Sequence, residues 1–421
     1  MEANAYLDIL RAEIKPALGC TEPIAVALAV ARAREALGAM PDSVRLRVSR
    51  NILKNAMGVG IPGTGMVGLE IAAALSCVAG RSAYGLEVLG GADEEDRARA
   101  RRLAAQGLVQ AEPKETDKKL YIEAELTRDA HTALCVIEGT HTGISLVTLD
   151  GRVLQQGRTG AQHAGAAADH RMDVAGIYRF VTSVDVGELA FLREVIEMNE
   201  AIAQEGLKGD YGMRVGKVLR GEGPEDDVPL KDYAVAYTAA AADARMAGCT
   251  LPVMSTAGSG NQGLTATLPV VAVVRRLNLS EESLLRAQAL SQLVTIHIKT
   301  HIGRLSPLCG CAIAASIGSC CAVTYLLGGT QSALCRAIKN MIADISGLIC
   351  DGAKSGCALK IATSVASAMQ CAQLALAGVG AGCLDGIIAQ DVERTIENLG
   401  SLGSLGMQAT DRVILDMMIA K

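Results

Sequence analysis

Aromatic side chains and excess positive charge are both scarce in this sequence. It has no Trp, two Phe and eight Tyr among 421 residues, and 40 Lys and Arg stand against 45 Asp and Glu. Proteins that bind nucleic acid through bulk charge need a basic excess, and single-stranded bases stack on aromatic rings. The composition therefore argues against a nucleic-acid partner.

A secretory leader and a Cys-x-x-Cys pair are also missing. The first residues carry acidic and basic side chains (Glu2, Asp8, Arg11) with no apolar core after a basic start. We therefore expect a cytoplasmic protein whose 13 cysteines are reduced thiols. The odd count fits a complete disulfide framework poorly. Without Cys-x-x-Cys, zinc ribbons and ferredoxin-type clusters lack their usual spacing.

Charge is absent from three long stretches: Met246–Val274, Leu305–Cys335 and Ile361–Leu384. Their length would permit membrane spans, and the mean hydropathy is +0.28. However, they are rich in Gly, Ala, Ser and Cys, the first contains two prolines, and neither Trp anchors nor basic clusters flank them. We interpret them as buried helices and expect no membrane partner.

Small and hydrophobic residues are abundant in the chain. Half of its residues are hydrophobic, and 45 are Gly, above the usual ~7%. Up to about residue 155, runs with strand character alternate with helical ones; beyond it almost every segment has helical spacing. We predict an α+β protein with a small mixed N-terminal domain, residues 1–155, and an all-helical domain, residues 156–421.

The N-terminal domain is expected to contain an antiparallel sheet. Apolar and basic residues alternate over Val44–Val48, and three further runs separated by turn signals predict a meander, at Leu120–Leu126, Ala133–Glu138 and Ile144–Leu149. Asn51–Gly65 is dense in Gly and Asn and predicts a loop.

The first candidate site is Gly19–Pro23. Pro23 favours a helix that starts here, which places Cys20 just before the helix N-terminus. That position favours a thiolate and lowers the thiol pKa. Cys20 is then an acid/base, a metal ligand or a buried cap.

The second candidate is Lys54 and Asn55, followed by the Gly-rich run Gly58–Gly65. Such backbone beside a Lys and an Asn can cradle a carboxylate, and an ordinary irregular loop is the alternative. The third candidate is Ser255–Gly263, a polar turn within an uncharged stretch. Because polar groups buried without partners are costly, we expect this turn to line a wet cleft or bind a ligand.

Histidine and cysteine provide the remaining candidates. His297 and His301 lie four residues apart on an expected helix, but no Glu follows His297, so we interpret them as two half-exposed side chains rather than a zinc site. Cys350 and Cys357 flank a Gly-containing turn and could share a metal centre with a third cysteine, although buried core thiols are the simpler alternative. The other cysteines have bland contexts and are predicted to lie in the core.

Taken together, five motifs resemble the L-cysteine desulfidase family, which is related to the iron–sulfur L-serine dehydratases. They occur in order over nearly the whole chain: GCTEP, KNAMGVGIPGTG, STAGSGNQG, GRLSPLCGC and CDGAKSGC. The resemblance implies an oxygen-sensitive [4Fe–4S] cluster held by Cys309, Cys350 and Cys357, with Cys20 as catalytic acid/base or displaceable fourth ligand. Cys311 lies so near Cys309 that either could be the first ligand.

The resemblance also implies where an amino-acid substrate binds. Lys54, Asn55 and the Gly63–Gly65 backbone are expected to hold its carboxylate, with Arg304 in reserve. Asn261 and Gln262 are expected to orient it. The complete set of expected substrate-binding residues is Thr21, Glu22, Lys54, Asn55, Gly63, Thr64, Gly65, Asn261, Gln262 and Arg304.

The activity that follows is α,β-elimination of L-cysteine to pyruvate, ammonia and sulfide. Cys20 in place of a Ser/His-rich motif favours a thiol substrate over serine. An iron–sulfur serine dehydratase and a non-catalytic thiol or iron sensor remain alternatives. A pyridoxal-phosphate lyase is disfavoured, since no lysine motif suits a Schiff base. We expect a small-molecule substrate and allow for a homodimer.

Overall fold

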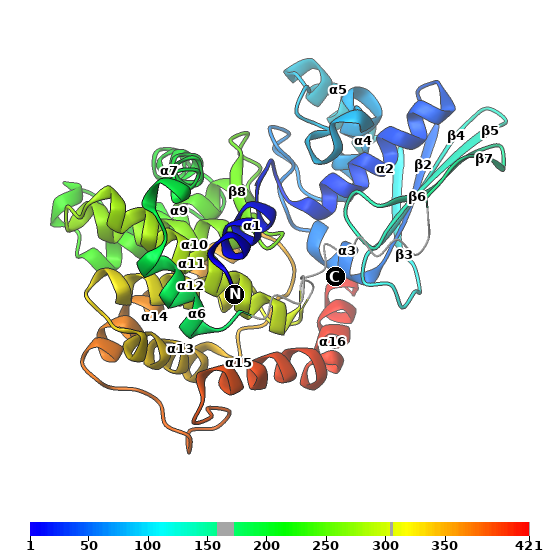
Figure 1. Ribbon diagram of the computed structural model, residues 1–421. Coiled ribbons are helices and arrows are strands. Elements are labelled where there is room, and N and C mark those ends of the chain that lie inside the picture. Colours follow the sequence, from blue (N-terminus) through cyan, green and yellow to red (C-terminus); the bar gives the residue numbers. More distant parts are fainter. Residues whose placement is uncertain (158–171, 304–305, 421) are drawn as a thin grey trace.

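The computed structural model describes residues 1–157, 172–303 and 306–420. It has two parts, a sheet with its covering helices and a larger helical part (Figure 1). The α+β class is confirmed, and the expected meander is present. The expected boundary at residue 155 stays a prediction.

The sheet of the N-terminal part has six strands in the order β3-β2-β4-β5-β6-β7. β2 is parallel to β3, and all other neighbours are antiparallel, so the sheet is mixed rather than purely antiparallel. The strands span β2 (Ser43–Val48), β3 (Val109–Pro113), β4 (Tyr121–Arg128), β5 (His131–Glu138), β6 (Ile144–Leu149) and β7 (Arg152–Gln156).

Helices cover one face of this sheet. α2 (Thr21–Leu37) packs on β4, β5 and β6, and α4 (Leu69–Ala79) and α5 (Glu94–Ala105) follow behind it. Alternate strand residues such as Leu46, Ala124 and Cys135 are fully buried against these helices. Their core is separate from that of the helical part. A 3₁₀ turn (Ser82–Glu87) connects α4 to α5.

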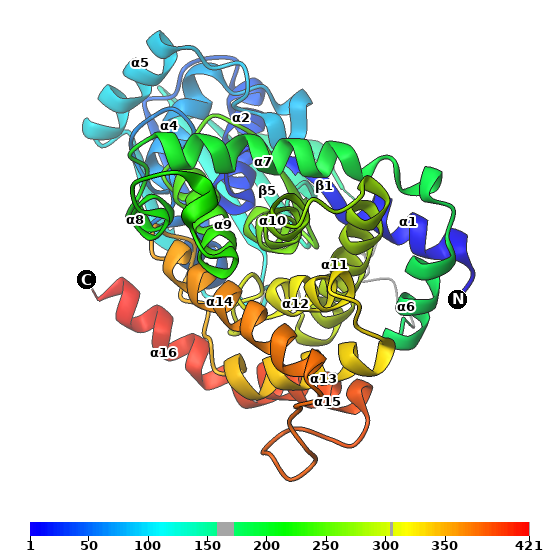
Figure 2. The ribbon, with the colours of Figure 1, turned by 90° about the vertical axis from the view of Figure 1, so that its left-hand side faces the viewer.

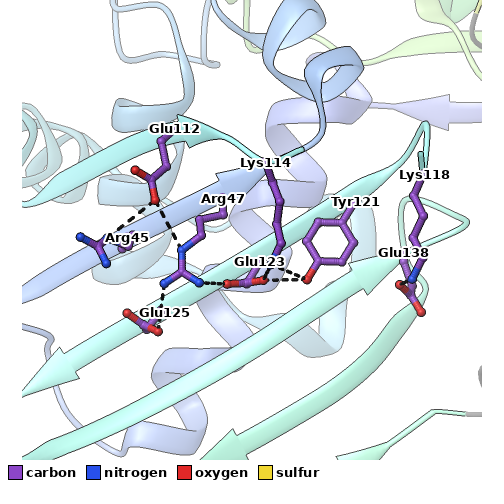
Figure 3. Close-up of polar contacts among 9 residues, drawn as sticks. All are labelled: Arg45, Arg47, Glu112, Lys114, Lys118, Tyr121, Glu123, Glu125 and Glu138. Atoms are coloured by element: carbon purple, nitrogen blue, oxygen red, sulfur yellow. Dashed lines mark hydrogen bonds and ion pairs between the residues drawn. The ribbon is translucent and has the colours of Figure 1, made fainter. Parts of the chain in front are cut away.

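The opposite face of the sheet carries charged side chains (Figure 3). Glu123, which is 6% exposed, accepts hydrogen bonds from Lys114, Arg47 and Tyr121, the last at 2.6 Å. Burial alone would raise the pKa of Glu123, but these donors outweigh burial and hold its pKa below the ordinary value. This network is structural in character and lies on the sheet, away from the sequence motifs.

In the helical part, α10 lies at the centre, in contact with α7, α9, α11 and α12 (Figure 2). Residues 260–274 of α10 are all buried, as the uncharged stretch predicts. The helices are α6 (Val174–Ser183), α7 (Leu192–Lys208), α8 (Val215–Arg220), α9 (Leu230–Met246), α10 (Gly260–Arg276), α11 (Glu281–Ile302), α12 (Ala314–Leu326), α13 (Gln331–Ile345), α14 (Cys357–Leu376), α15 (Val392–Ser401) and α16 (Gln408–Ile419), with short turns at Val186–Leu189, Glu225–Asp227 and Leu402–Gly406.

Both ends of the chain connect the two parts. α1 (Ala3–Glu13) packs in the core of the helical part, and β1 (Ile14–Ala17) pairs antiparallel with β8 (Val253–Thr256). At the other end, α16 returns to α3 (Arg50–Ala56), where Arg50 lies 3.4 Å from Asp416. The chain therefore passes between the parts directly before Cys20 and again after α15.

Three expectations about these segments are wrong. Residues 50–56 form α3 rather than loop, because Ile52, Leu53 and Ala56 bury one face of a short helix. His297 is 2% exposed rather than half-exposed, since its Nε2 binds Glu393 Oε2 at 2.7 Å between α11 and α15. Of the cysteines expected in the core, Cys383 is exposed and Cys335 is half-buried.

Within the described ranges, none of the helices has both the length and the apolar character needed to span a bilayer.

Candidate active site

Cys20 lies at the point where the chain enters the N-terminal part. It is the N-cap of α2, as the sequence predicts, and it is 4% exposed. Gly19 before it has φ +74°, and a Cβ there would lie 3.1 Å from Pro62, so this turn needs glycine. Cys20 packs in a small buried cluster with Val59, Met246 and Cys357. The structure thus brings together three motifs that are far apart in the sequence.

The environment of Cys20 differs from the expectation of a lowered thiol pKa. Burial raises the pKa of Cys20, and the neighbouring Arg245 guanidinium opposes that rise without overcoming it. The helix N-terminus alone does not decide the protonation state, because the thiol is removed from water. Arg245 is the charged group that favours the thiolate here.

The Gly-rich run Gly58–Gly65 docks on the helical part. Gly60 N donates to Met246 O at 2.8 Å, and Gly63 N donates to Gly248 O at 2.9 Å. A Cβ on Gly60 would lie 2.4 Å from the backbone of Ala247. These glycines therefore permit close backbone contact between the two parts. The Gly63 amide already donates a hydrogen bond to Gly248 O.

Most side chains expected to hold a carboxylate have partners within the protein. Lys54, 3% exposed, forms an ion pair with Asp411 of α16 and lies 3.4 Å from Cys350 O. Asn55 Nδ2 donates to Glu22 Oε1 at 3.1 Å. Glu22 Oε2 in turn accepts from Thr21 Oγ1 at 3.1 Å.

The other residues expected to hold the carboxylate are Gly63, Thr64, Gly65 and Arg304. Thr64 Oγ1 donates to Ile61 O at 2.8 Å, and the Arg97 side chain fills the space beside Gly63. Gly65 has φ +68° in the same turn, with open space beside its Cα. Arg304 lies outside the described residues.

Backbone pairing aligns the two cysteine-bearing loops. Cys309 N donates to Leu348 O at 2.9 Å, and Cys350 N donates to Pro307 O at 2.6 Å. Cys357 opens α14, with Gly356 as its N-cap. Cys309, Cys350 and Cys357, separated in sequence, are therefore presented from adjoining backbone segments.

The thiols of these loops interact with one another. Cys309 and Cys311 sulfurs are 3.4 Å apart, and the hydrogen bond from Cys311 lowers the pKa of Cys309 to about 6. Burial raises the pKa of Cys350, and it raises that of Cys357 to about 12; the charge of Cys309 adds to both. Four thiols thus lie within electrostatic range of one another.

Whether these thiols fit a metal depends on its kind. Among the described residues, no three His, Cys, Asp or Glu side chains are placed to hold a single metal ion. An iron–sulfur cluster is held instead by separate thiolates around a larger inorganic core. Four neighbouring thiols, all buried except the half-buried Cys350, match that chemistry. The geometry of the described thiols disfavours a mononuclear site and is compatible with a cluster.

Lysines provide positive charge around the four thiols. Lys299 and Lys360 favour the thiolate of Cys309 and lower its pKa, and Lys54 and Lys299 oppose the rise in the pKa of Cys350. Lys299 is 6% exposed. A cluster with three thiolate ligands brings negative charge into this interior, which buried cations would stabilise.

Asn261 and Gln262 occupy the first turn of α10. Asn261 Oδ1 accepts from Arg245 Nη1 at 3.0 Å. Gln262 Nε2 donates to Thr256 O at 3.2 Å, while its buried Oε1 has no hydrogen-bond partner among the described residues. A Cβ on Gly310 would lie 2.7 Å from that oxygen. Both amides are therefore buried, and that of Gln262 lies beside the Cys309 loop.

Two residues of this site escape the sequence motifs: Arg245 and Met246. Both end the Ala-rich helix α9, outside every motif. A signal is present, because Arg245 is the last charge before the uncharged stretch that follows it. A basic residue in the last turn also suits the helix dipole, so this position alone does not identify a functional group.

Comparison with known proteins places the whole chain in one family. The sequence profile of the serine dehydratase alpha chain matches residues 83–416. A UPF0597 protein of Clostridium perfringens is 45% identical over 99% of this chain and 98% of its own length. UPF0597 proteins of Oleidesulfovibrio alaskensis and Phocaeicola vulgatus are each 44% identical over all of this chain and 99% and 98% of theirs. The chain therefore belongs to the serine dehydratase alpha chain family.

Proposed function

We propose that this protein is an iron–sulfur-dependent lyase that converts L-cysteine to pyruvate, ammonia and sulfide. The observation that carries the proposal is the packing of Cys20 against Cys357, beside the neighbouring thiols of Cys309, Cys311 and Cys350. A candidate base and a candidate set of cluster ligands thus share one buried site. Membership of the serine dehydratase alpha chain family supports a lyase of the iron–sulfur type.

Cys309, Cys350 and Cys357 would hold the [4Fe–4S] cluster, with the Cys311 sulfur within hydrogen-bond distance of Cys309. When bound, the cluster supplies a Lewis acid for the departing β-substituent. The lysines near the thiols favour their ionised form, which is the form that binds iron.

Cys20 would move the proton of the reaction. Burial raises the pKa of Cys20, which makes its thiolate the stronger base, and Arg245 favours formation of that thiolate. The thiolate takes the proton from Cα of the substrate. The electron pair of that C–H bond forms the Cα–Cβ double bond, and the Cβ–S bond breaks with its pair on sulfur, which leaves as hydrosulfide. The resulting aminoacrylate tautomerises to an imine, and water hydrolyses the imine to pyruvate and ammonia.

L-Serine is the second candidate substrate, because the matched family is named for serine dehydratase. The sulfur-rich surroundings favour cysteine. Cys20, Met246 and Cys357 present thioether and thiol groups, which are weak hydrogen-bond partners for a hydroxyl. A buried hydroxyl without a good partner is costly, whereas a thiol tolerates such a site.

The test is turnover by the anaerobically reconstituted protein. Pyruvate, ammonia and sulfide should form in equal amounts from L-cysteine, and the kcat/KM for L-cysteine should exceed that for L-serine. A larger value for L-serine would support the dehydratase alternative. A full cluster without pyruvate from either amino acid would favour a sensor.

Cysteine variants separate the role of base, proposed for Cys20, from that of cluster ligand, proposed for Cys357. Cys20→Ala should keep its iron and lose turnover, because it removes the base and spares the ligands. Cys357→Ala should lose iron and turnover together. Cys77→Ala is the matched control, since that thiol is equally buried but lies in the core of the N-terminal part. Full activity of Cys20→Ala would refute its role as base.

A further inference from the structure

Arg245 is a buried cation that lacks a carboxylate counterion among the described residues. Its side chain lies at the end of α9 and is 5% exposed. It donates to two neutral oxygens, Asn261 Oδ1 at 3.0 Å and Gly19 O at 2.8 Å. Its Nε has no hydrogen-bond partner, and in the part of the chain that the structure describes no carboxylate lies within ion-pair distance of it.

A buried charge in this position favours an anion, and the Cys20 thiol, which hydrogen-bonds the guanidinium, is one only when it is ionised. Removing a guanidinium from water costs several kcal/mol, which neutral acceptors repay only in part. Lys54 provides the contrast, because Asp411 already compensates its buried charge. Of these two buried cations, only Arg245 lacks an acidic partner from the described chain.

Backbone amides around Arg245 add to the positive potential. α2, α10 and α14 begin at this site, and none of their N-cap residues, Cys20, Ser259 and Gly356, forms a side-chain cap. Arg245 contacts the first of these helix starts through Gly19 O and the second through Asn261. Uncapped helix N-termini attract anions, and the buried guanidinium provides an independent observation of the same preference.

We propose that Arg245, with the first turns of α2 and α10, binds the α-carboxylate of the amino-acid substrate and places Cα beside Cys20. This inference rests on the proposed function and deepens it. A guanidinium fork suits a carboxylate because two of its N–H groups can bind both oxygens. The carboxylate-binding role expected from the sequence for Lys54 and the Gly63–Gly65 backbone is thereby assigned to Arg245.

The test measures binding separately from turnover. L-Alanine has the carboxylate and amine of the substrate but no leaving group, so calorimetry on the anaerobic full-length protein reports binding alone. Ethylamine, which lacks the carboxylate, is the matched probe and should not bind. Arg245→Met should weaken L-alanine binding about 10- to 150-fold, as expected for loss of a charge-assisted hydrogen bond. Arg245→Lys should recover part of that loss.

A second variant keeps the test decisive if Arg245→Met folds poorly. Asn261→Asp places a carboxylate 3.0 Å from the guanidinium and satisfies it internally, so the fold should be kept and L-alanine binding lost. The control is Lys114→Met combined with Glu123→Gln, which removes a compensated pair on the sheet of the N-terminal part and should leave L-alanine affinity within about 3-fold.

The outcomes distinguish this inference from the proposed function. Arg245-dependent L-alanine binding without pyruvate production would uphold the carboxylate site and refute the lyase. Pyruvate production with unchanged L-alanine affinity in Asn261→Asp would uphold the lyase and overturn the role of Arg245. Failure of the wild-type protein to bind L-alanine, or equal binding of ethylamine, would also overturn that role.

Discussion

Gly352→Ala should separate the two parts of the protein at the cysteine loops. Gly352 lies between Cys350 and Cys357 with φ +88°, and a Cβ there would lie 2.1 Å from the carbonyl oxygen of Lys54. Backbone cannot yield as a flexible side chain can, so α3 and the loop must move apart. The variant therefore tests whether contact between the parts positions Cys350 and Cys357.

Two costs add up at this position. A left-handed conformation costs a non-glycine residue about 1–2 kcal/mol. Overpacking against fixed atoms adds roughly 1–3 kcal/mol. Gly378→Ala isolates the first cost, because Gly378 has φ +82° but nothing within 4 Å of its Cβ position among the described residues. Gly352→Ala should thus lose about 2–5 kcal/mol of unfolding free energy, and Gly378→Ala about 1–2 kcal/mol.

Urea denaturation monitored by circular dichroism measures these losses, and iron per chain after anaerobic reconstitution measures the effect on the site. We expect Gly378→Ala to keep its iron and Gly352→Ala to lose most of it. Equal stabilities and equal iron contents in the two variants would refute the reasoning, because both glycines have a left-handed backbone and Gly352 alone of the two lies against the Lys54 carbonyl.

Three further predictions concern other parts of the structure. Glu123→Gln should cost ~1–3 kcal/mol in urea denaturation at pH 7 by removing the charged acceptor of Lys114. The pKa of Glu123 is lower in the folded than in the unfolded protein, so the stability difference between wild type and Glu123→Gln is full above the unfolded pKa and should vanish as pH falls through the folded pKa. A stability difference that stays the same at acid pH would contradict this. Glu393→Ala should cost about 1–3 kcal/mol, since it leaves the buried His297 without its acceptor, and an unchanged melting temperature would show that this pair contributes nothing. Gly310→Ala should lower iron per chain, because its Cβ would lie 2.7 Å from a buried amide oxygen; full iron retention would show that the loop adapts.

The sequence predicts those elements whose side chains alternate in burial. β2 and β4 bury one face in the core of the N-terminal part, so apolar residues recur at every second position. β3 and β7 give no such signal because they are edge strands: β7 is exposed throughout, and β3 ends at Pro113. Without a buried face, an edge strand shows no alternation.

The site is predictable as motifs but not as an arrangement. Cys20, Cys309, Cys350 and Cys357 stand out through their glycine and proline neighbours. Their partners depend on tertiary contacts that spacing does not contain. Lys54 meets Asp411 from the far end of the chain, a pairing that spacing does not predict.

The role proposed for Arg245 escapes the sequence for the same reason. Arg245 ends a helix rich in alanine, and its polar partners come from two distant loops. Only the fold shows that it lacks a carboxylate among the described residues. A sequence motif identifies a reactive group, whereas the charge balance around that group requires the structure.

The most direct test of the account is the amount of iron and acid-labile sulfide per chain after anaerobic reconstitution. We expect about four of each in the wild-type protein, and near zero in the Cys309→Ala, Cys350→Ala and Cys357→Ala variants. Near zero of both in folded wild-type protein would contradict the account, and the coupled thiols would then be core residues.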